Sequence, residues 1–224
     1  MVEIGPGPGA LTRPLLTTLA HLDVVEIDRE MVARLQAEFP AEQLSVHAVD
    51  ALAFDFASLG PGLRVVGNLP YNISSPLLFH LADSAAAIID MTFMLQKEVV
   101  DRMAAAPDTP DYGRLSVMLQ ARFKVIKLFT VPPGAFQPPP KVDSAIVRLA
   151  PLPAADVPYD NARVFAEVVA RAFGQRRKTL RNTLKGWVDE ALFAELGIDP
   201  RRRGETLSVA EFAALSNRLQ PLAG

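Results

Sequence analysis

MVEIGPGPG, residues 1–9, is the most informative segment of this 224-residue chain. Residues 1–4 form a short apolar run that predicts a strand, and the glycine and proline cluster after it ends that strand in a turn. Residues 10–20 carry leucines at helical spacing, and Leu22–Ile27 is the next apolar run. Strand, glycine turn, helix and strand in this order are typical of a parallel α/β sheet.

The same alternation continues through the first 150 residues. Helical patterns lie at 29–39 and from Ser75 onward. Further strands are predicted at 44–46, 63–67, 87–95, 123–130 and 145–149. The last two flank a proline-rich loop and give the sheet an antiparallel end. We therefore expect an α/β fold with a mostly parallel sheet and helices on both faces.

A second proline-rich stretch, residues 151–158, predicts a domain boundary. After it the pattern is wholly helical, with helices expected at 161–173 and 178–190. A last helix is entered at Ser208, whose spacing to Glu211 matches a capping box. The expected division is therefore residues 1–152 and a small all-helical C-terminal domain, residues 153–224.

The composition excludes several classes of protein. Half of the residues are hydrophobic and 21% are charged, which is incompatible with a disordered chain. Cysteine is absent, so disulfides and thiolate chemistry are excluded, and three scattered histidines predict no metal site. No apolar run is long enough for a membrane span, and no signal peptide opens the chain. We expect a cytoplasmic protein, because absent cysteine is typical of a reducing compartment.

The net charge of −2 conceals an uneven distribution. Residues 1–150 hold 12 Lys+Arg and 16 Asp+Glu, whereas residues 151–224 hold 11 and 9. The sequence from Gln175 to Lys185 contains five cations and no acid, and Arg201 to Arg203 adds three more. A basic surface is therefore predicted on the C-terminal domain.

The glycine turn predicts a cofactor site. Glycines allow positive φ and let a ligand approach the backbone closely. Glu26 closes the second strand, where a carboxylate can accept hydrogen bonds from both hydroxyls of a ribose. These features fit a dinucleotide and also S-adenosylmethionine. Asp50, after the third strand, either accepts a hydrogen bond from an adenine amine or is an ordinary turn aspartate.

The sequence Asn68-Leu69-Pro70-Tyr71 follows the fourth strand, at the sheet edge where open α/β folds bind ligands. An asparagine carbonyl and a backbone carbonyl can accept the two hydrogens of an adenine amine and aim its lone pair at a methyl sulfonium. Pro70 orients the preceding carbonyl, and Tyr71 offers a ring for base stacking. The alternative is a strand-end turn with a buried tyrosine, and the complete tetrapeptide favours the functional interpretation.

The chain resembles the ribosomal RNA adenine dimethyltransferases, most closely the bacterial small-subunit branch associated with kasugamycin sensitivity. The resemblance covers nearly the whole chain in order. It rests on EIGPGPGALT (3–12), VVEID (24–28), DAL (50–52), NLPYNISSPLLFHL (68–81), LQKEVVDRM (95–103), YGRLSV (112–117), PPGAFQPPPKVDSAIVRL (132–149) and FGQRRKTLRNTL (173–184). Pro8, where a leucine is more usual, is a minor departure.

This resemblance implies a Rossmann-like class I methyltransferase that uses S-adenosylmethionine and dimethylates two adjacent adenines near the 3′ end of small-subunit rRNA. The expected partner is small-subunit rRNA within the pre-30S particle, and we expect a monomer that binds no metal and no membrane. The implied cofactor residues are Gly5, Gly7, Glu26, Ile27, Asp50, Ala51 and Asn68. The implied catalytic loop is Asn68, Leu69, Pro70 and Tyr71. Phe136 is either the second stacking wall beside Tyr71 or a hydrophobic plug under its loop.

The basic segment predicts RNA contact. Arg176, Arg177, Lys178 and Arg181 carry four cations without an acid among them, and phosphate contact is favoured over a solvated helix face. Charge reversal of the first three is expected to weaken rRNA binding and to leave cofactor affinity intact.

Only four residues precede Gly5, whereas members of the resembled family carry several tens of residues there, including an FGQNFL-like segment. We expect weakened cofactor binding and low activity in a chain without that segment. Three other functions compete: a large-subunit rRNA methyltransferase, an NAD-dependent oxidoreductase, and a non-catalytic ribosome-assembly factor. The NISSP and PPPKVDS segments favour the small-subunit branch, and no convincing proton donor supports the oxidoreductase.

Overall fold

The computed structural model describes residues 1–70, 73–137 and 139–219. Contacts divide the chain into two compact units. The first comprises residues 1–100 and 124–151, and the second comprises residues 101–123 and 152–224. The second unit therefore contains a segment, 101–123, that lies on the N-terminal side of the boundary predicted at residues 152–153.

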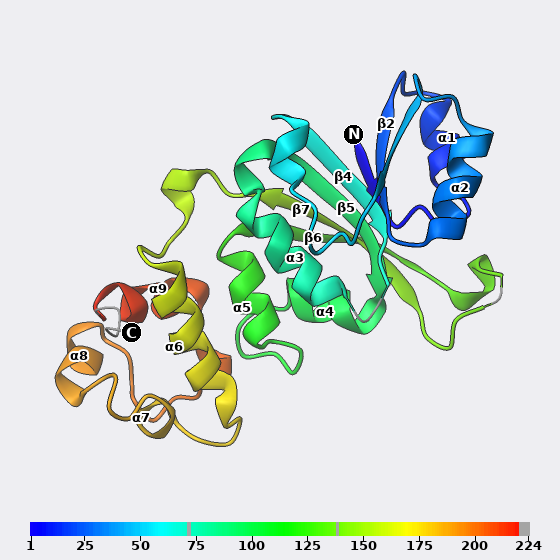
Figure 1. Cartoon of the computed structure of the whole chain (residues 1–224). Coiled ribbons are helices and arrows are strands. Elements are labelled where there is room, and N and C mark those ends of the chain that lie inside the picture. The colour runs from blue at the N-terminus through cyan, green and yellow to red at the C-terminus, as the bar shows by residue number, and fades with distance from the viewer. Residues whose placement is uncertain (71–72, 138, 220–224) are drawn as a thin grey trace. The chain divides into compact units, whose positions relative to one another are not determined.

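The first unit is built on a seven-stranded sheet with the order β3-β2-β1-β4-β5-β7-β6 (Figure 1). The strands are β1 (Val2–Ile4), β2 (Leu22–Glu26), β3 (Leu44–Ala48), β4 (Leu63–Asn68), β5 (Ile88–Gln96), β6 (Phe123–Val131) and β7 (Ser144–Pro151). β1 to β5 pair in parallel, and β7 is antiparallel to β5. The predicted α/β sheet with an antiparallel end is confirmed.

Helices of the first unit pack on the sheet. They are α1 (Thr12–Leu16), α2 (Arg29–Glu38) and α3 (Ser74–Asp83). A further helix, α4 (Lys97–Ala104), follows β5 and passes from the first unit into the second between residues 100 and 101. α1 and α2 contact β2, and their leucines join Leu22, Val24 and Leu44 in a small core. α3 crosses the face of β4 and β5 that is turned to the viewer in Figure 1 and buries Leu77, Leu78 and Leu81.

The first helix is shorter than the predicted 10–20. It begins at Thr12 and ends at Leu16, where the Thr17 and Thr18 hydroxyls donate to the carbonyl oxygens of Pro14 (2.7 Å) and Leu15 (3.0 Å). Such local hydrogen bonds compete with continuation of the helix. The leucine spacing still marks the buried face.

The second unit is helical. Its helices are α5 (Arg114–Gln120), α6 (Ala162–Gly174), α7 (Leu180–Thr183), α8 (Glu190–Glu195) and α9 (Val209–Asn217). The chain also forms short 3-10 helices at Phe56–Leu59, Ala85–Ala87, Pro133–Ala135, Ala154–Asp156 and Gly204–Thr206. α5, α6 and α9 enclose a core that includes Val117, Phe165 and Phe212.

One predicted helix is wrong in extent. Residues 178–190 form a single helical turn, α7, and Asp189 then caps the separate helix α8 by accepting the Leu192 N–H (2.8 Å). The capping box at Ser208 is confirmed: its N–H donates to Glu211 Oε2 (2.8 Å), and the Glu211 N–H donates back to Ser208 Oγ (3.2 Å).

Candidate active site

The glycine turn lies between β1 and α1 and adopts the backbone that the sequence predicts. Gly5, Gly7 and Gly9 have φ of +64°, +51° and +86°, a region that residues with a Cβ rarely adopt. The Gly5 N–H donates to the Val25 carbonyl (3.0 Å), which ties the start of the turn to β2. The backbone of this turn is therefore held close to the carboxyl end of the sheet.

Glu26, the last residue of β2, organises this loop through both carboxylate oxygens. Oε2 accepts the Gly7 N–H (3.1 Å), and Oε1 accepts the N–H groups of Ile27 (2.9 Å) and Asp28 (3.0 Å). A carboxylate offers about four lone-pair sites, so roughly one remains for a ligand hydroxyl. Most of the hydrogen-bonding capacity of Glu26 therefore holds the loop backbone, and the remainder is available to a ribose hydroxyl.

The other residues predicted to hold the adenosine lie next to Glu26. The Val49 N–H donates to the Glu26 carbonyl (3.1 Å), which brings the end of β3 beside the end of β2. Ile27 is 66% exposed, which is unusual for isoleucine and leaves an apolar surface free. One Asp50 carboxylate oxygen accepts the Leu52 N–H (2.9 Å), so this oxygen stabilises a turn, as the second of the two predicted roles requires. The neighbouring Ala51 is buried.

Asn68 ends β4 beside Met94 of β5. Its side chain is exposed, and its amide makes no hydrogen bond with any residue that the structure describes. Leu69 is 1% exposed and its N–H donates to the Met94 carbonyl (3.2 Å), which fixes the backbone after Asn68. Pro70 is described and exposed, whereas Tyr71 lies outside the described residues.

A cavity of about 460 Å³ opens beside Asn68. Its wall comes from the glycine turn, β4, β5, β7 and the proline-rich loop, and it is mainly apolar. The lining residues are Ala10, Leu11, Val66, Gly67, Asn68, Thr92, Phe93, Met94, Phe136 and Ile146. The half-buried Phe136 therefore shares a cavity with Asn68, as its predicted stacking role requires, and an aromatic base fits such a lining.

Two residues of this site escaped the sequence interpretation. A Cβ at Gly67 would lie 2.6 Å from the carbonyl oxygen of Ile4, so only glycine allows β1 and β4 to approach here. A lone glycine inside a strand pattern is the available signal for such an approach. Glu3 is 2% exposed on β1, immediately before the glycine turn, and no sequence signal distinguished it from an ordinary strand residue.

The charges around the turn favour a cationic cofactor over a pyrophosphate. Two carboxylates lie here: Glu26 is the last residue of β2, and Glu3 is one residue before the end of β1. Arg13, the cation near Gly9, is held by Glu38 at 2.6 Å. An anionic pyrophosphate would be repelled here, whereas a positively charged sulfonium would be attracted. The residues present fit S-adenosylmethionine, which we expect Gly5, Gly7, Glu26, Ile27, Asp50 and Ala51 to hold.

The predicted basic segment is partly neutralised by acids distant in sequence. Arg176 Nε lies 3.4 Å from Glu205, and Arg181 forms a two-point ion pair with Glu190 at 2.7 and 2.9 Å. Arg176 and Arg181 are therefore each compensated by an acid from outside the segment, although no acid lies among the four cations in the sequence. Arg177 and Lys178 are exposed, and neither side chain has an ion pair or hydrogen bond with a described residue.

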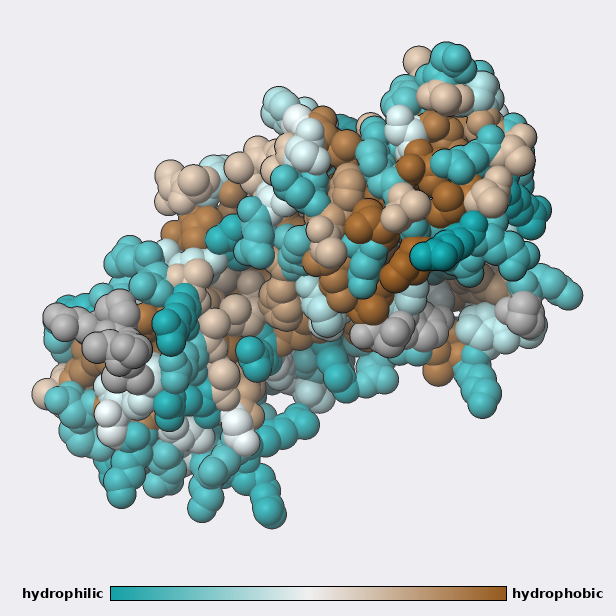
Figure 2. Space-filling view, viewed as in Figure 1, coloured by the Kyte–Doolittle hydropathy of each residue, from teal (hydrophilic) through white to brown (hydrophobic). Residues whose placement is uncertain are grey.

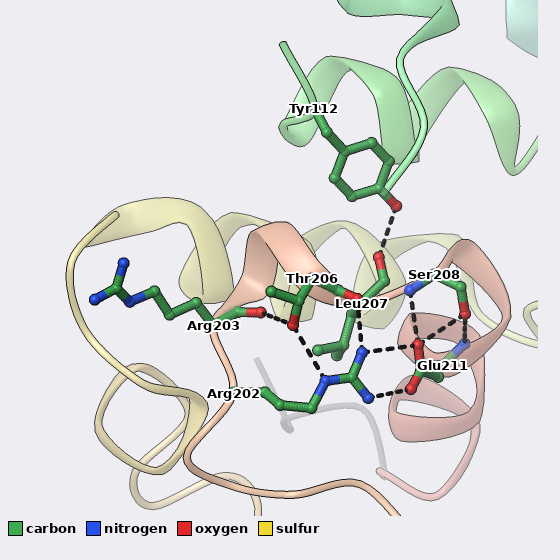
Figure 3. A network of polar contacts seen from close by, with 7 residues as sticks. All are labelled: Tyr112, Arg202, Arg203, Thr206, Leu207, Ser208 and Glu211. Carbon is green, nitrogen blue, oxygen red and sulfur yellow. Dashed lines mark hydrogen bonds and ion pairs between the residues drawn. The ribbon is translucent and has the colours of Figure 1, made fainter. Parts of the chain in front are cut away.

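The arginine triplet 201–203 is also paired. Arg201 binds Asp199 at 2.9 Å, and Arg203 lies 3.8 Å from Glu205. Arg202 donates to both carboxylate oxygens of Glu211, to the Thr206 hydroxyl and to the Thr206 carbonyl (Figure 3). The same network reaches Tyr112, whose hydroxyl donates to the Leu207 carbonyl (2.8 Å). These arginines stabilise the second unit. Among the cations of residues 175–185, the exposed side chains of Arg177, Lys178 and Lys185 have no ion pair or hydrogen bond with a described residue.

In the view of Figure 2, hydrophilic side chains dominate the surface over α7 and α8. Across the described ranges, no three His, Asp or Glu side chains gather as a metal site would require. None of the helices described is long and apolar enough to cross a membrane.

Comparison with known proteins gives consistent matches. The family model of ribosomal RNA adenine dimethylase matches residues 1–221. The chain is 64% identical over 217 residues to ribosomal RNA small subunit methyltransferase A of Aromatoleum aromaticum, which covers 97% of this chain and 82% of that protein. The protein of the same name from Laribacter hongkongensis is 62% identical over 220 residues, 97% of this chain and 84% of the relative.

Solved structures agree in fold. A dimethyladenosine transferase from Plasmodium falciparum superposes with a TM-score of 0.81 at 28% identity, over 96% of this chain and 87% of that one. The 23S rRNA methyltransferase ErmE superposes with a TM-score of 0.69 at 26% identity, over 97% of this chain and 89% of that chain. These matches confirm the resemblance found in the sequence and the class I methyltransferase fold. The chain belongs to the ribosomal RNA adenine dimethylase family.

Proposed function

We propose that this chain dimethylates the exocyclic amines of two adjacent adenines in the 3′-terminal hairpin of small-subunit rRNA. The observation that carries the proposal is the Asn68 amide, which is exposed at the end of β4 and has no hydrogen bond to a residue that the structure describes, beside a mainly apolar cavity that includes Phe136. An amide carbonyl in that position is available to an adenine amine. The family's cofactor, S-adenosylmethionine, supplies the methyl group.

The residues of the loop can perform the positioning that this reaction needs. Asn68 Oδ1 and the Leu69 carbonyl are acceptors for the two amine hydrogens, so that the nitrogen lone pair turns toward the methyl donor. Leu69 is buried and its N–H donates to the Met94 carbonyl, which fixes the backbone from which both acceptors project. No strong base is needed, because the alkylated amine is acidic enough to lose its proton to water. Phe136 and Tyr71 are proposed to hold the extruded base by stacking.

The partner is proposed to be the small-subunit rRNA within the pre-30S particle, bound by the protein as a cytoplasmic monomer. Relatives named for the small subunit at 56–64% identity support this branch over the large-subunit one. Arg177 and Lys178 are proposed to contact phosphates, because neither cation is bound to an acid among the described residues.

The test is methyl transfer from labelled S-adenosylmethionine to unmethylated small subunits, with large-subunit RNA as the control substrate. We expect label on N6 of two adjacent adenines of the small subunit only. Asn68→Ala is expected to lower kcat by about 100-fold or more, in the range seen when one positioned polar group is removed from an active site. Its thermal stability should not change, because the Asn68 side chain is exposed and makes no hydrogen bond within the described part of the chain. Label on large-subunit RNA, or an unaffected kcat, contradicts the proposal.

A further inference from the structure

A buried carboxylate–hydroxyl pair brackets the glycine turn. Glu3, on β1, is 2% exposed, and Thr12, the first residue of α1, is fully buried. The Thr12 hydroxyl donates to Glu3 Oε2 at 2.7 Å, across nine positions of sequence. Glu3 directly precedes the segment Ile4–Leu11, and Thr12 directly follows it, so this bond closes the loop that carries all three positive-φ glycines of the turn.

The turn has few other fixed points. Its N–H groups are held at Gly5 by Val25 and at Gly7 by Glu26, and the Gly9 N–H bonds back to Pro6 within the turn. The α1 N-terminus has no side-chain cap, because Leu11 precedes the helix and its side chain has no hydrogen-bond acceptor. Glycine-rich backbone has large conformational freedom in the absence of such restraints. In the C-terminal half of the turn, the Gly9 carbonyl accepts the Arg13 N–H (3.2 Å), and the Thr12 hydroxyl adds a side-chain attachment that reaches back to β1.

Burial of the Glu3 carboxylate costs free energy, which is unusual for a group with a purely structural role. A carboxylate in an apolar environment loses its hydration, and a hydrogen bond only partly replaces it. Glu3 lies on the same face of the sheet as Glu26, because Glu3 pairs with Val24 in register and side chains alternate along β2. Burial raises the pKa of Glu3, the Thr12 hydrogen bond opposes the rise, and the charge of Glu26 adds to it.

We propose that Glu3 and Thr12 form a latch that holds the glycine turn in its binding-competent shape, so that both act as positioning residues for the cofactor site. Their burial keeps them from direct contact with a ligand, and their effect passes through the loop that they close. The proposal deepens the cofactor site of the proposed function and rests on that function only for its second measurement.

The first measurement needs neither cofactor nor RNA. Amide hydrogen exchange of the free chain reports the opening of the turn at Gly7 and Gly9, with Val24 and Val65 in the neighbouring strands as references. Thr12→Val removes the hydroxyl at nearly constant volume, and Thr12→Ser retains it. We expect exchange at Gly7 and Gly9 to increase roughly 10-fold or more in Thr12→Val, as for the loss of a hydrogen bond to a charged group. In Thr12→Ser it should stay within about twofold of the parent.

Thr12→Val leaves a buried carboxylate without a partner and can fail to fold. The double variant Glu3→Gln with Thr12→Val removes that charge and is expected to fold with the same opened turn. The second measurement is the calorimetric Kd of S-adenosylmethionine, expected to rise by about the factor seen in exchange, because the competent state is less populated. Unchanged exchange at Gly7 and Gly9, or an equal increase at Val24 and Val65, overturns the latch. Neither result depends on methyl transfer, so failure of the latch is distinguishable from failure of the proposed function.

Discussion

At the scale of single residues, the site depends on groups whose chemistry is simple but whose surroundings restrict them. Gly67 is required by a backbone carbonyl, Glu26 is occupied mainly by backbone N–H groups, and Asn68 is left open. A side chain at position 67 is excluded by the Ile4 carbonyl of β1. We therefore expect a substitution of Gly67 to change the free energy of unfolding rather than the rate of catalysis.

Gly67→Ala is expected to lower the free energy of unfolding by about 1–3 kcal/mol, as overpacking does. The added Cβ would meet the Ile4 carbonyl at 2.6 Å, and this backbone atom cannot move without disturbing the pairing of β1 with β4. Urea denaturation measures the change. Gly134→Ala is the matched control, because a Cβ there meets no atom within 4 Å, and its effect should stay within about 0.5 kcal/mol. Equal stability of the two variants would contradict the close approach.

Glu3→Gln tests the buried charge through pH. Burial raises the pKa of Glu3 above its usual 4.5, with the Thr12 hydrogen bond opposing and Glu26 adding to the rise. Above pH 4.5 the folded state therefore holds a proton that the unfolded state has lost, and the stability of the parent falls as pH rises through this window. Glutamine does not titrate. The unfolding free energy of Glu3→Gln minus that of the parent should increase from pH 4.5 upward, and a difference independent of pH would refute the shift.

At the scale of elements, the glycine turn and the basic segment differ in how far sequence predicts them. The glycine turn is formed by residues close together in sequence: strand, glycines and helix follow one another, and Glu26 ends the next strand. Its parts can therefore be predicted from their order along the chain. The basic segment is not local, because Glu205 and Glu190, which pair with Arg176 and Arg181, come from other elements. Gly67 and the Glu3–Thr12 bond escaped for the same reason: each depends on contacts between separate elements.

The double variant Arg177→Gln with Lys178→Gln is expected to weaken binding of small-subunit rRNA and to reduce the slope of log K against log salt by about 2, one unit for each lost phosphate contact. Fluorescence anisotropy with labelled RNA at several salt concentrations measures both effects. Arg181→Gln is the control within the same segment. Its guanidinium is already bound to Glu190, so its removal should change the slope less. A slope unchanged in the double variant would exclude these side chains as phosphate contacts.

At the scale of the whole molecule, the proposed function assigns two tasks to two units. The residues that fit the cofactor and the target base belong to the first unit, and the exposed cations Arg177 and Lys178 belong to the second. The sequence predicted this division by its change from alternating to wholly helical pattern. It assigned residues 101–123 to the first part, because a linear boundary cannot describe a helical unit built from two separate segments of chain.

This division predicts that damage to the second unit leaves cofactor binding intact. Arg202 joins residues 206–208 to α9 through Glu211, whose pKa is raised by burial but lowered overall by hydrogen bonds from Arg202 and Ser208. Arg202→Ala should destabilise the chain by about 1–3 kcal/mol, because Glu211 and the Thr206 carbonyl lose their donor. Arg201→Ala, which breaks only an exposed pair with Asp199, should cost less than about 1 kcal/mol.

Hydrogen exchange identifies the elements that Arg202→Ala destabilises, and calorimetry measures its affinity for S-adenosylmethionine. Exchange should accelerate in α6 and α9 of Arg202→Ala and stay at parental rates in β1, β2 and β4, while the Kd of S-adenosylmethionine is unchanged. The RNA affinity of the same variant should fall, because the segment carrying Arg177 and Lys178 is attached to residue 202 through the Leu180 N–H, which donates to the Arg202 carbonyl (2.8 Å). A parallel loss of cofactor affinity would mean that the two units fold and act as one.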